Sequence, residues 1–250
     1  MVTKAYDVCA ATGDHGAAFA LGSDHAAVSL PASSPFALAC GGTAPVSSAD
    51  GVLGEAVWND FGPSLLNLGS IGGSAGGGGV STLSAVPSWQ QPHLPPLSVH
   101  TAEAGRGVPD VAAAAAPFPG VVCLLDGLAV ACGGTALSAA LWAALVARMN
   151  HNKIGRPLGF LTPHLYALPR AATFNDVTVG GNETNGLIGG YFARRGWDVC
   201  TGLGTPRGDA ILRGLAYLAD GGPGPRACGR LTLMRSVAGR HWSALPPTAG

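Results

Sequence analysis

The segment CGGTALSAALWAALVARMN, residues 132–150, has the pattern with which many serine hydrolases present a nucleophile at the start of a helix. A tight Gly-Gly-Thr turn leads directly into a run of Ala and Leu. The residue after Thr135 is Ala136, and a methyl group has no lone pair with which to attack a carbonyl carbon. Ser138 does not take its place, because two residues along a helix rotate a side chain by about 200°. The segment therefore predicts a turn like those that present the nucleophile in serine hydrolases, but with alanine at the position of the nucleophile.

A Gly-Asp-X-Gly loop at residues 13–16 supplies a candidate carboxylate. The apolar run before it predicts a buried strand that opens into this polar loop, which contains Asp14. Asp14 alone is also explained as a turn residue, because Asp is common in tight turns. A second carboxylate, Asp110 in GVPDVA, is interpreted as a buried loop residue that binds backbone amides.

The elements around these residues follow from periodicity and turn residues. Residues 121–135 predict a β-hairpin with its turn at Asp126-Gly127, and the helix that follows extends to about Asn150. We expect that helix to pack on a core through the apolar positions Leu137, Leu141, Trp142, Leu145 and Met149.

Further elements are predicted on both sides of that helix. Residues 28–45 and 54–60 predict neighbouring strands, and a short helix is expected with Thr162 as its N-cap. The Gly-rich stretch 69–81 predicts a flexible loop or a place where another backbone approaches closely. A phosphate-binding loop is disfavoured there, because the Lys-Ser/Thr of a P-loop is absent. An amphipathic helix over 207–222 closes the main domain, residues 1–222, and we expect residues 223–250 to form an irregular tail.

Composition excludes several classes of function. The formal net charge of the 250 residues is zero and only 11% are charged, so nucleic acid and anionic membranes are not predicted partners. No apolar run is long enough for a transmembrane helix, and no secretory signal is visible. The six cysteines form no CxxC pair, which argues against a zinc site and a disulfide scaffold. The seven histidines lack metal-ligand spacing, and nothing supports a Ser-His-Asp triad.

Ten stretches in a fixed order resemble one family. They are ATGDHG, LPASSPFALACGGT, VWND, GGGVS, PSWQ, GRGVPDVA, GGTALSAALWAALVARMN, GFLTPHLYAL, FNDVTVGGN and GWDVCTGLGTPRG. Together they resemble the sedolisins, the serine-carboxyl peptidases, and within them the kumamolisin-like branch. The resemblance implies an α/β fold with a subtilisin-like parallel sheet flanked by helices. It covers roughly the C-terminal two-thirds of the catalytic domain, so the domain is expected to be truncated at its N-terminus.

The resemblance also implies a mechanism for peptide-bond hydrolysis at acidic pH. A Ser attacks the carbonyl carbon, a Glu assisted by an Asp four residues later takes its proton, and another Asp stabilises the oxyanion. Asp14 matches the oxyanion Asp and Ala136 matches the Ser. The Glu-Asp helix would lie upstream of Asp14, and this chain contains no Glu-x-x-x-Asp pair. We therefore expect a peptidase by descent that is inactive.

One structural calcium ion is the cofactor that the resemblance implies. Its ligands would be the carboxylates of Asp176 and Asp198 and the backbone carbonyls of Val177, Arg194 and Gly196. Oxygen ligands from two loops suit this hard cation. The sequence departs from the family at Arg194, where the family has Gly, and two arginines close to calcium would weaken its binding.

Several interpretations of function and partner stay open. The resemblance implies a protein or peptide substrate, and the missing N-terminal part of the peptidase is a further candidate partner. A secreted location also follows from the resemblance alone. The alternative function is a non-catalytic module that binds a peptide or a partner through the remnant of the cleft around the Gly-rich loop. Ala136 is equally compatible with an engineered knock-out, which sequence does not separate from natural loss.

Overall fold

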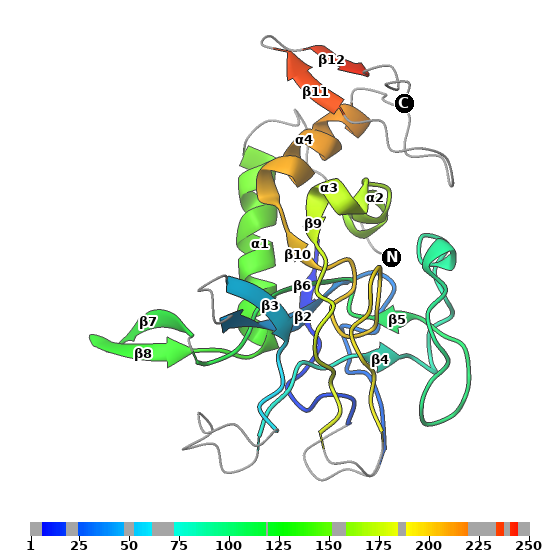
Figure 1. The fold of residues 1–250 in the computed structure, drawn as a ribbon, viewed down its shortest axis with the longest axis vertical. Helices are drawn as coiled ribbons and strands as arrows, with labels where there is room; N and C mark the ends of the chain where they lie inside the picture. Colours follow the sequence, from blue (N-terminus) through cyan, green and yellow to red (C-terminus); the bar gives the residue numbers. More distant parts are fainter. Residues whose placement is uncertain are drawn as a thin grey trace.

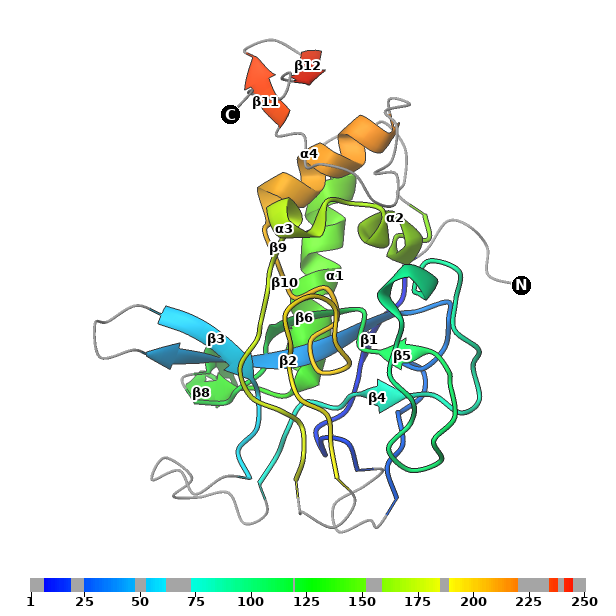
Figure 2. The same ribbon diagram turned by 45° about the vertical axis from the view of Figure 1, so that its right-hand side comes forward.

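The structure is a computed structural model that describes residues 7–18, 25–47, 53–61, 73–118, 120–151, 159–184, 189–219, 234–237 and 241–244. Its central sheet is built around the longest strand, β2 (Leu38–Ser47). Strands β1 (Cys9–Ala11) and β6 (Val111–Ala114) pair with β2 in parallel, and β3 (Leu53–Val57) pairs with it antiparallel. Figures 1 and 2 show this sheet at the middle of the molecule.

The sheet is therefore mixed, and the prediction of a parallel sheet holds only for the pairs that β2 makes with β1 and β6. The reason is the short connection between β2 and β3. Five residues separate Ser47 from Leu53, which suffices for an antiparallel hairpin, whereas a parallel pair needs a crossover of about a dozen residues. The two strands are neighbours, as the sequence predicts.

Helix α1 (Thr135–His151) packs against β1, β2 and β6 (Figure 1). Its buried residues are Thr135, Ser138, Trp142, Val146 and Met149. Trp142 and Met149 agree with the predicted face, but Leu141 is 40% exposed, so the buried stripe is rotated from the one that we expected. Thr135 and Ser138 are both buried, so the buried stripe begins with polar residues at the N-terminal end of the helix.

A second group of helices lies above the sheet in Figure 1. It consists of α2 (Thr162–Tyr166), α3 (Arg170–Thr173) and α4 (Gly208–Ala219), and α4 contacts the other two. Strand β9 (Phe174–Asn175) leaves α3 and pairs with β10 (Thr205–Pro206), which precedes α4. The N-cap of α2 is Leu161, so the prediction of Thr162 as N-cap is wrong by one residue. The Thr162 hydroxyl is instead buried and has no hydrogen-bond partner.

Two short ladders and a 3-10 turn complete the main body. Strands β7 (Val121–Leu125) and β8 (Leu128–Cys132) form the predicted hairpin, with Asp126 and Gly127 at its turn. Strand β4 (Gly79–Val80) pairs with β5 (Gly107–Val108), and the 3-10 turn η1 covers Gln91–His93.

The tail differs from the irregular segment that the sequence predicts. Strands β11 (Met234–Val237) and β12 (His241–Ala244) form an antiparallel hairpin within residues 223–250, drawn beyond the end of α4 in Figure 1. The other residues of that tail lie outside the described ranges.

Close backbone contacts explain the Gly-rich stretch. A Cβ atom added at Gly77 would lie 2.2 Å from the carbonyl oxygen of Thr12, and one at Gly78 would lie 2.1 Å from that of Val199. For residues 73–81, the interpretation as a place where another backbone approaches closely is therefore confirmed. Residues 69–72 lie outside the described ranges.

Two further expectations concern thiols and membranes. The five described cysteines have free thiols in this structure, and Cys228 lies outside the described residues. Among the helices of the described residues, none has the length and apolar character needed to cross a bilayer.

Candidate functional site

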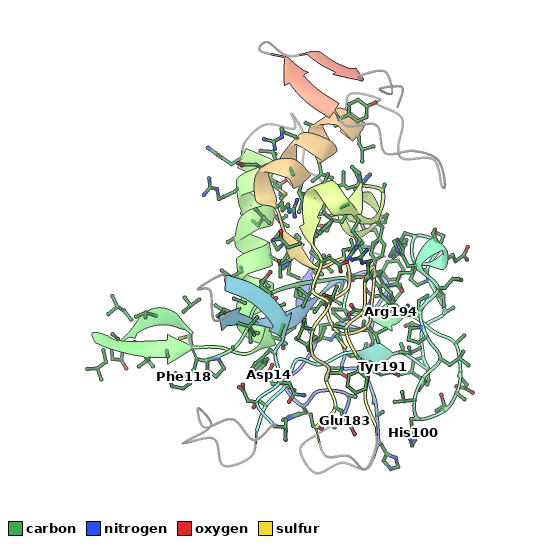
Figure 3. The ribbon with its side chains drawn as sticks, viewed as in Figure 1. Asp14, His100, Phe118, Glu183, Tyr191 and Arg194 are labelled. Carbon is green, nitrogen blue, oxygen red and sulfur yellow. The ribbon has the colours of Figure 1, made fainter. Side chains whose placement is uncertain are left out.

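The loop that follows β1 and the turn before α1 meet at Asp14. The Oδ1 atom of Asp14 accepts two hydrogen bonds from Thr135, one from its backbone N–H and one from its hydroxyl, both at 2.8 Å. The backbone N–H of Gly13 donates to the Thr135 hydroxyl at 3.0 Å. The two segments are thus joined by hydrogen bonds among Gly13, Asp14 and Thr135, two of which end on the Asp14 carboxylate. Figure 3 shows Asp14 beside the N-terminal end of α1, the end that follows β8 along the chain.

A glycine lets the turn approach this carboxylate. Gly134 has φ +87°, which is rare for residues with a side chain, and a Cβ atom there would lie 2.8 Å from Asp14 Oδ2. The Gly-Gly-Thr sequence is therefore explained by the contact with Asp14.

Ala136 is the second residue of α1 and is exposed, directly after the residue that binds Asp14. The structure thus brings together the two positions that the resemblance assigns to the oxyanion Asp and the nucleophile. Their catalytic roles stay predictions. Ser138 lies on the other side of the helix, is completely buried, and its hydroxyl has no hydrogen-bond partner. Its position agrees with the helical geometry that excludes it as a substitute nucleophile.

A buried polar network lies elsewhere in the core, around Asp110. As predicted, this carboxylate binds a backbone amide, the N–H of Ala39, at 2.8 Å. It also forms an ion pair with Arg106 at 2.5 Å, and both side chains are fully buried. Arg106 further donates to the backbone carbonyls of Ala32 and Ala37.

Two more side chains extend this network. The Tyr166 hydroxyl donates to Asp110 Oδ1 at 3.1 Å, and the Gln90 amide donates to the same atom at 3.2 Å. Trp197 donates its indole N–H to the Tyr166 hydroxyl at 2.9 Å. Sequence reasoning missed Arg106, Gln90 and Tyr166. A signal was available for two of them. Arg106 in GRGVPDVA and Gln90 in PSWQ are long polar side chains among small and apolar residues, a pattern that indicates a buried polar contact.

Burial shifts the pKa values of this network. Loss of solvation raises the pKa of Asp110, and the positive charge of Arg106 opposes that rise. Burial and the nearby Asp110 carboxylate raise the pKa of Tyr166 well above its usual value. The tyrosine therefore stays a hydrogen-bond donor, which suits a role in fixing Asp110.

The five residues predicted to bind calcium lie in two neighbouring segments. Asp176 and Val177 directly follow β9, and Arg194, Gly196 and Asp198 lie in the loop before Cys200. The N–H of Gly196 donates to Asp176 Oδ2 at 3.1 Å, so the two segments are in contact. Asp198 is buried, and the loss of solvation raises its pKa while backbone hydrogen bonds oppose the rise.

Several of the predicted calcium ligands already accept hydrogen bonds in this arrangement. The Arg170 guanidinium binds Asp176 Oδ1, and the same nitrogen donates to the carbonyl oxygen of Gly196 at 2.9 Å. Both oxygens of Asp198 accept backbone N–H groups, at 2.8 to 3.2 Å. In the described residues, no group of three or more His, Cys, Asp or Glu side chains is arranged to hold a metal ion. Calcium binding stays a prediction from the resemblance.

Comparisons with known proteins agree with the geometry. The chain is 46% identical to kumamolisin from Bacillus sp. (strain MN-32) over 209 residues, which are 83% of this chain and 36% of that protein. It is 33% identical to human tripeptidyl-peptidase 1 over 212 residues, 74% of this chain and 32% of that protein. A comparison with models of known protein families finds no match.

A solved structure extends the likeness to the fold. The structure of Pseudomonas sedolisin, a serine-carboxyl proteinase complexed with two molecules of pseudo-iodotyrostatin, matches with a TM-score of 0.64 and 30% identity. The match covers 84% of this chain and 55% of that one. The fold and these likenesses relate the chain to the serine-carboxyl proteinases. More particularly, it is homologous to the sedolisin family, and it spans about a third of the length of kumamolisin and of human tripeptidyl-peptidase 1.

Proposed function

We propose that this chain is the C-terminal part of a subtilisin-like sedolisin catalytic domain that no longer hydrolyses peptide bonds. The observation that carries the proposal is Ala136, exposed beside the Asp14–Thr135 contact at the start of α1. Homology to peptidases supports a protein or peptide as the ancestral substrate. At this position a serine hydroxyl would face solvent and substrate, but a methyl group cannot form an acyl intermediate.

The remaining residues of the site would have limited roles. A protonated Asp14 could donate a hydrogen bond to an oxyanion, and its contacts with Thr135 fix its position. The 250 residues contain no Glu-x-x-x-Asp pair that would serve as the base. Glu55 is already used in the fold, since its two carboxylate oxygens accept hydrogen bonds from Thr43 at 3.1 Å and Thr205 at 2.5 Å.

We expect Ala136→Ser to restore no peptidase activity. A serine without a general base keeps its proton at acidic pH and is a poor nucleophile. The measurement is cleavage of an unfolded protein at about pH 3–5, where the carboxylate mechanism operates. The unchanged chain and the variant are both compared with active kumamolisin.

Cleavage by the unchanged chain would contradict the proposed loss of function. Cleavage by Ala136→Ser alone would show that a base is supplied within this chain, and that only the nucleophile has been lost. Asp14→Ala in the Ala136→Ser background then tells whether any such activity uses the predicted oxyanion residue.

We infer a second function, binding of the missing part of a sedolisin domain, from the exposed β7–β8 hairpin. Figure 1 shows the hairpin projecting from the body of the molecule, and Figure 3 shows Phe118 beside its base. Large apolar side chains are exposed on it, among them Val122 at 72%, Leu124 at 80% and Leu128 at 69%. Val122 and Leu124 lie on one face of the hairpin and Leu128 on the other, and exposed apolar patches are typical of interaction sites.

The choice of partner rests on the share of the solved structure that is matched. The match covers 55% of the solved sedolisin chain, so a sedolisin domain contains a large portion that lies outside the match. The outer face of α1 supports the same partner, because it presents Leu141 and the small residues Ala140, Ala144 and Ala147 to solvent. A small-residue face is suited to close packing against another element. The Gly-rich loop is a weaker candidate, because the hollow that it lines has no enclosed volume that would hold even a water molecule, whereas ligand pockets usually have about 300–1,000 Å³.

We expect the chain to bind the N-terminal portion of a sedolisin catalytic domain when the two are co-expressed. Replacing Val122 and Leu124, which lie on one face of the hairpin, together by Lys should reduce that binding by at least about tenfold, because the complex would bury two ammonium groups. Leu83→Lys is the matched control, since Leu83 is 87% exposed outside the hairpin. Equal binding by the hairpin variant and the control would exclude the hairpin as the docking surface.

A further inference from the structure

Arg170, the first residue of α3, joins three segments of the chain. One of its guanidinium nitrogens contacts both Asp176 Oδ1 and the carbonyl oxygen of Gly196, the latter at 2.9 Å. Its Nε donates to the carbonyl oxygen of Leu203 at 3.1 Å. The Arg170 and Asp176 side chains are only 21% and 30% exposed, so solvent screens their charges incompletely. A single cation therefore holds the segments after β9, around Gly196 and before β10.

Two of the three atoms that Arg170 binds, Asp176 Oδ1 and the carbonyl oxygen of Gly196, belong to the predicted calcium ligands. A guanidinium offers several N–H donors in a planar fork, and it can bind a carboxylate and carbonyls as a metal ion does. Unlike a bound ion, it is supplied by the chain and needs no free cation in solution.

The charge of this region also disfavours a divalent cation. Asp176 and Asp198 contribute two negative charges, whereas Arg170, Arg194 and Arg195 contribute three positive ones. Arg194 is held in place by its Nε, which donates to the carbonyl oxygen of Trp197 at 3.3 Å. Calcium affinity depends on the number of negative ligands, so adding two further charges to a region that is already positive costs free energy.

We propose that the Arg170 guanidinium replaces calcium in this chain and that the stability of the fold is independent of calcium. The role is structural: it fixes the loop after β9 against the loop that contains Gly196. The proposal goes beyond the lost peptidase activity and does not depend on it, because its tests measure stability and metal binding.

The first test is the thermal midpoint of the unchanged chain in EDTA and in millimolar CaCl2. We expect the two midpoints to differ by less than about 2 °C, because a ligand that does not bind the native state does not stabilise it. A calcium-dependent rise of more than about 2 °C that saturates with concentration would overturn the proposal and support the metal site. This test needs no variant.

The second test compares Arg170→Gln with Arg213→Gln, both measured in EDTA. Arg213 lies exposed on α4, so its replacement controls for the loss of one positive charge. We expect Arg170→Gln to melt about 3–8 °C below the control, because Asp176 and two carbonyl groups lose their donor. Equal midpoints for the two variants would overturn the structural role of Arg170.

Discussion

Asp110→Asn is expected to lower the free energy of unfolding by about 3–5 kcal/mol, the usual cost of removing one partner from a buried ion pair. Asp110 and Arg106 are fully buried and 2.5 Å apart. An asparagine would keep a polar side chain of nearly the same size but would leave the Arg106 charge uncompensated. The carbonyl groups of Ala32 and Ala37 would then be its main remaining partners. Those neutral dipoles compensate a full charge less well than a carboxylate does.

The measurement is urea denaturation followed by circular dichroism, with Asp126→Asn as the control. Asp126 is an exposed turn residue with φ +50°, and Asn-Gly serves such a turn as well as Asp-Gly. The double variant Arg106→Met, Asp110→Leu should lower the free energy of unfolding by less than the sum of its two single substitutions, because it leaves no unpaired buried charge. A loss for Asp110→Asn no larger than that for Asp126→Asn would show that the pair contributes little.

Trp142→Ala is the second substitution with a large expected effect. We expect it to lower the free energy of unfolding by about 3–5 kcal/mol. Trp142 is 1% exposed and lies between α1 and the sheet. Its indole N–H donates to the carbonyl oxygen of Ala112 on β6 at 3.0 Å, and its ring stacks on Phe174 with centroids 6.4 Å apart. Alanine would remove the hydrogen bond, the stacking and most of the apolar surface that the helix buries.

Two variants separate these contributions in the same denaturation experiment. Trp142→Phe keeps most of the side-chain volume and removes the N–H donor. We therefore expect its free energy of unfolding to lie between those of the unchanged chain and Trp142→Ala. Leu141→Ala is the matched control on the neighbouring, 40% exposed side chain, with an expected loss below about 1 kcal/mol. If Trp142→Ala were as stable as Leu141→Ala, the helix would not depend on this contact.

The features that sequence could predict are those set by local turn chemistry or by ordered motifs. The Asp126-Gly127 turn defines the β7–β8 hairpin, because both residues adopt positive φ there. The resemblance to the sedolisins implied that Asp14 and position 136 would belong to one site, and the structure brings them together through Thr135. Close backbone approach at Gly77 and Gly78 likewise follows from residue type.

The features that sequence reasoning missed depend on partners far along the chain. Arg106 reaches carbonyl groups at Ala32 and Ala37, and Glu55 reaches Thr205. Periodicity within α1 could not show that the side bearing Leu141 would be left exposed. Nor could a motif show that Arg170 would bind the predicted calcium ligands, because this arginine lies outside the ligand motifs. Such contacts are decided by tertiary packing, which local patterns do not encode.

The exposed β7–β8 hairpin also has a consequence for the protein in solution. Its strands carry Val and Leu side chains at high exposure, and each of the two strands has an outer edge that forms no ladder among the described residues. Such strands can pair with the same strands of another molecule. The self-associated fraction of the isolated chain should therefore increase with its concentration, and the zero net charge of the sequence provides little repulsion to prevent self-association.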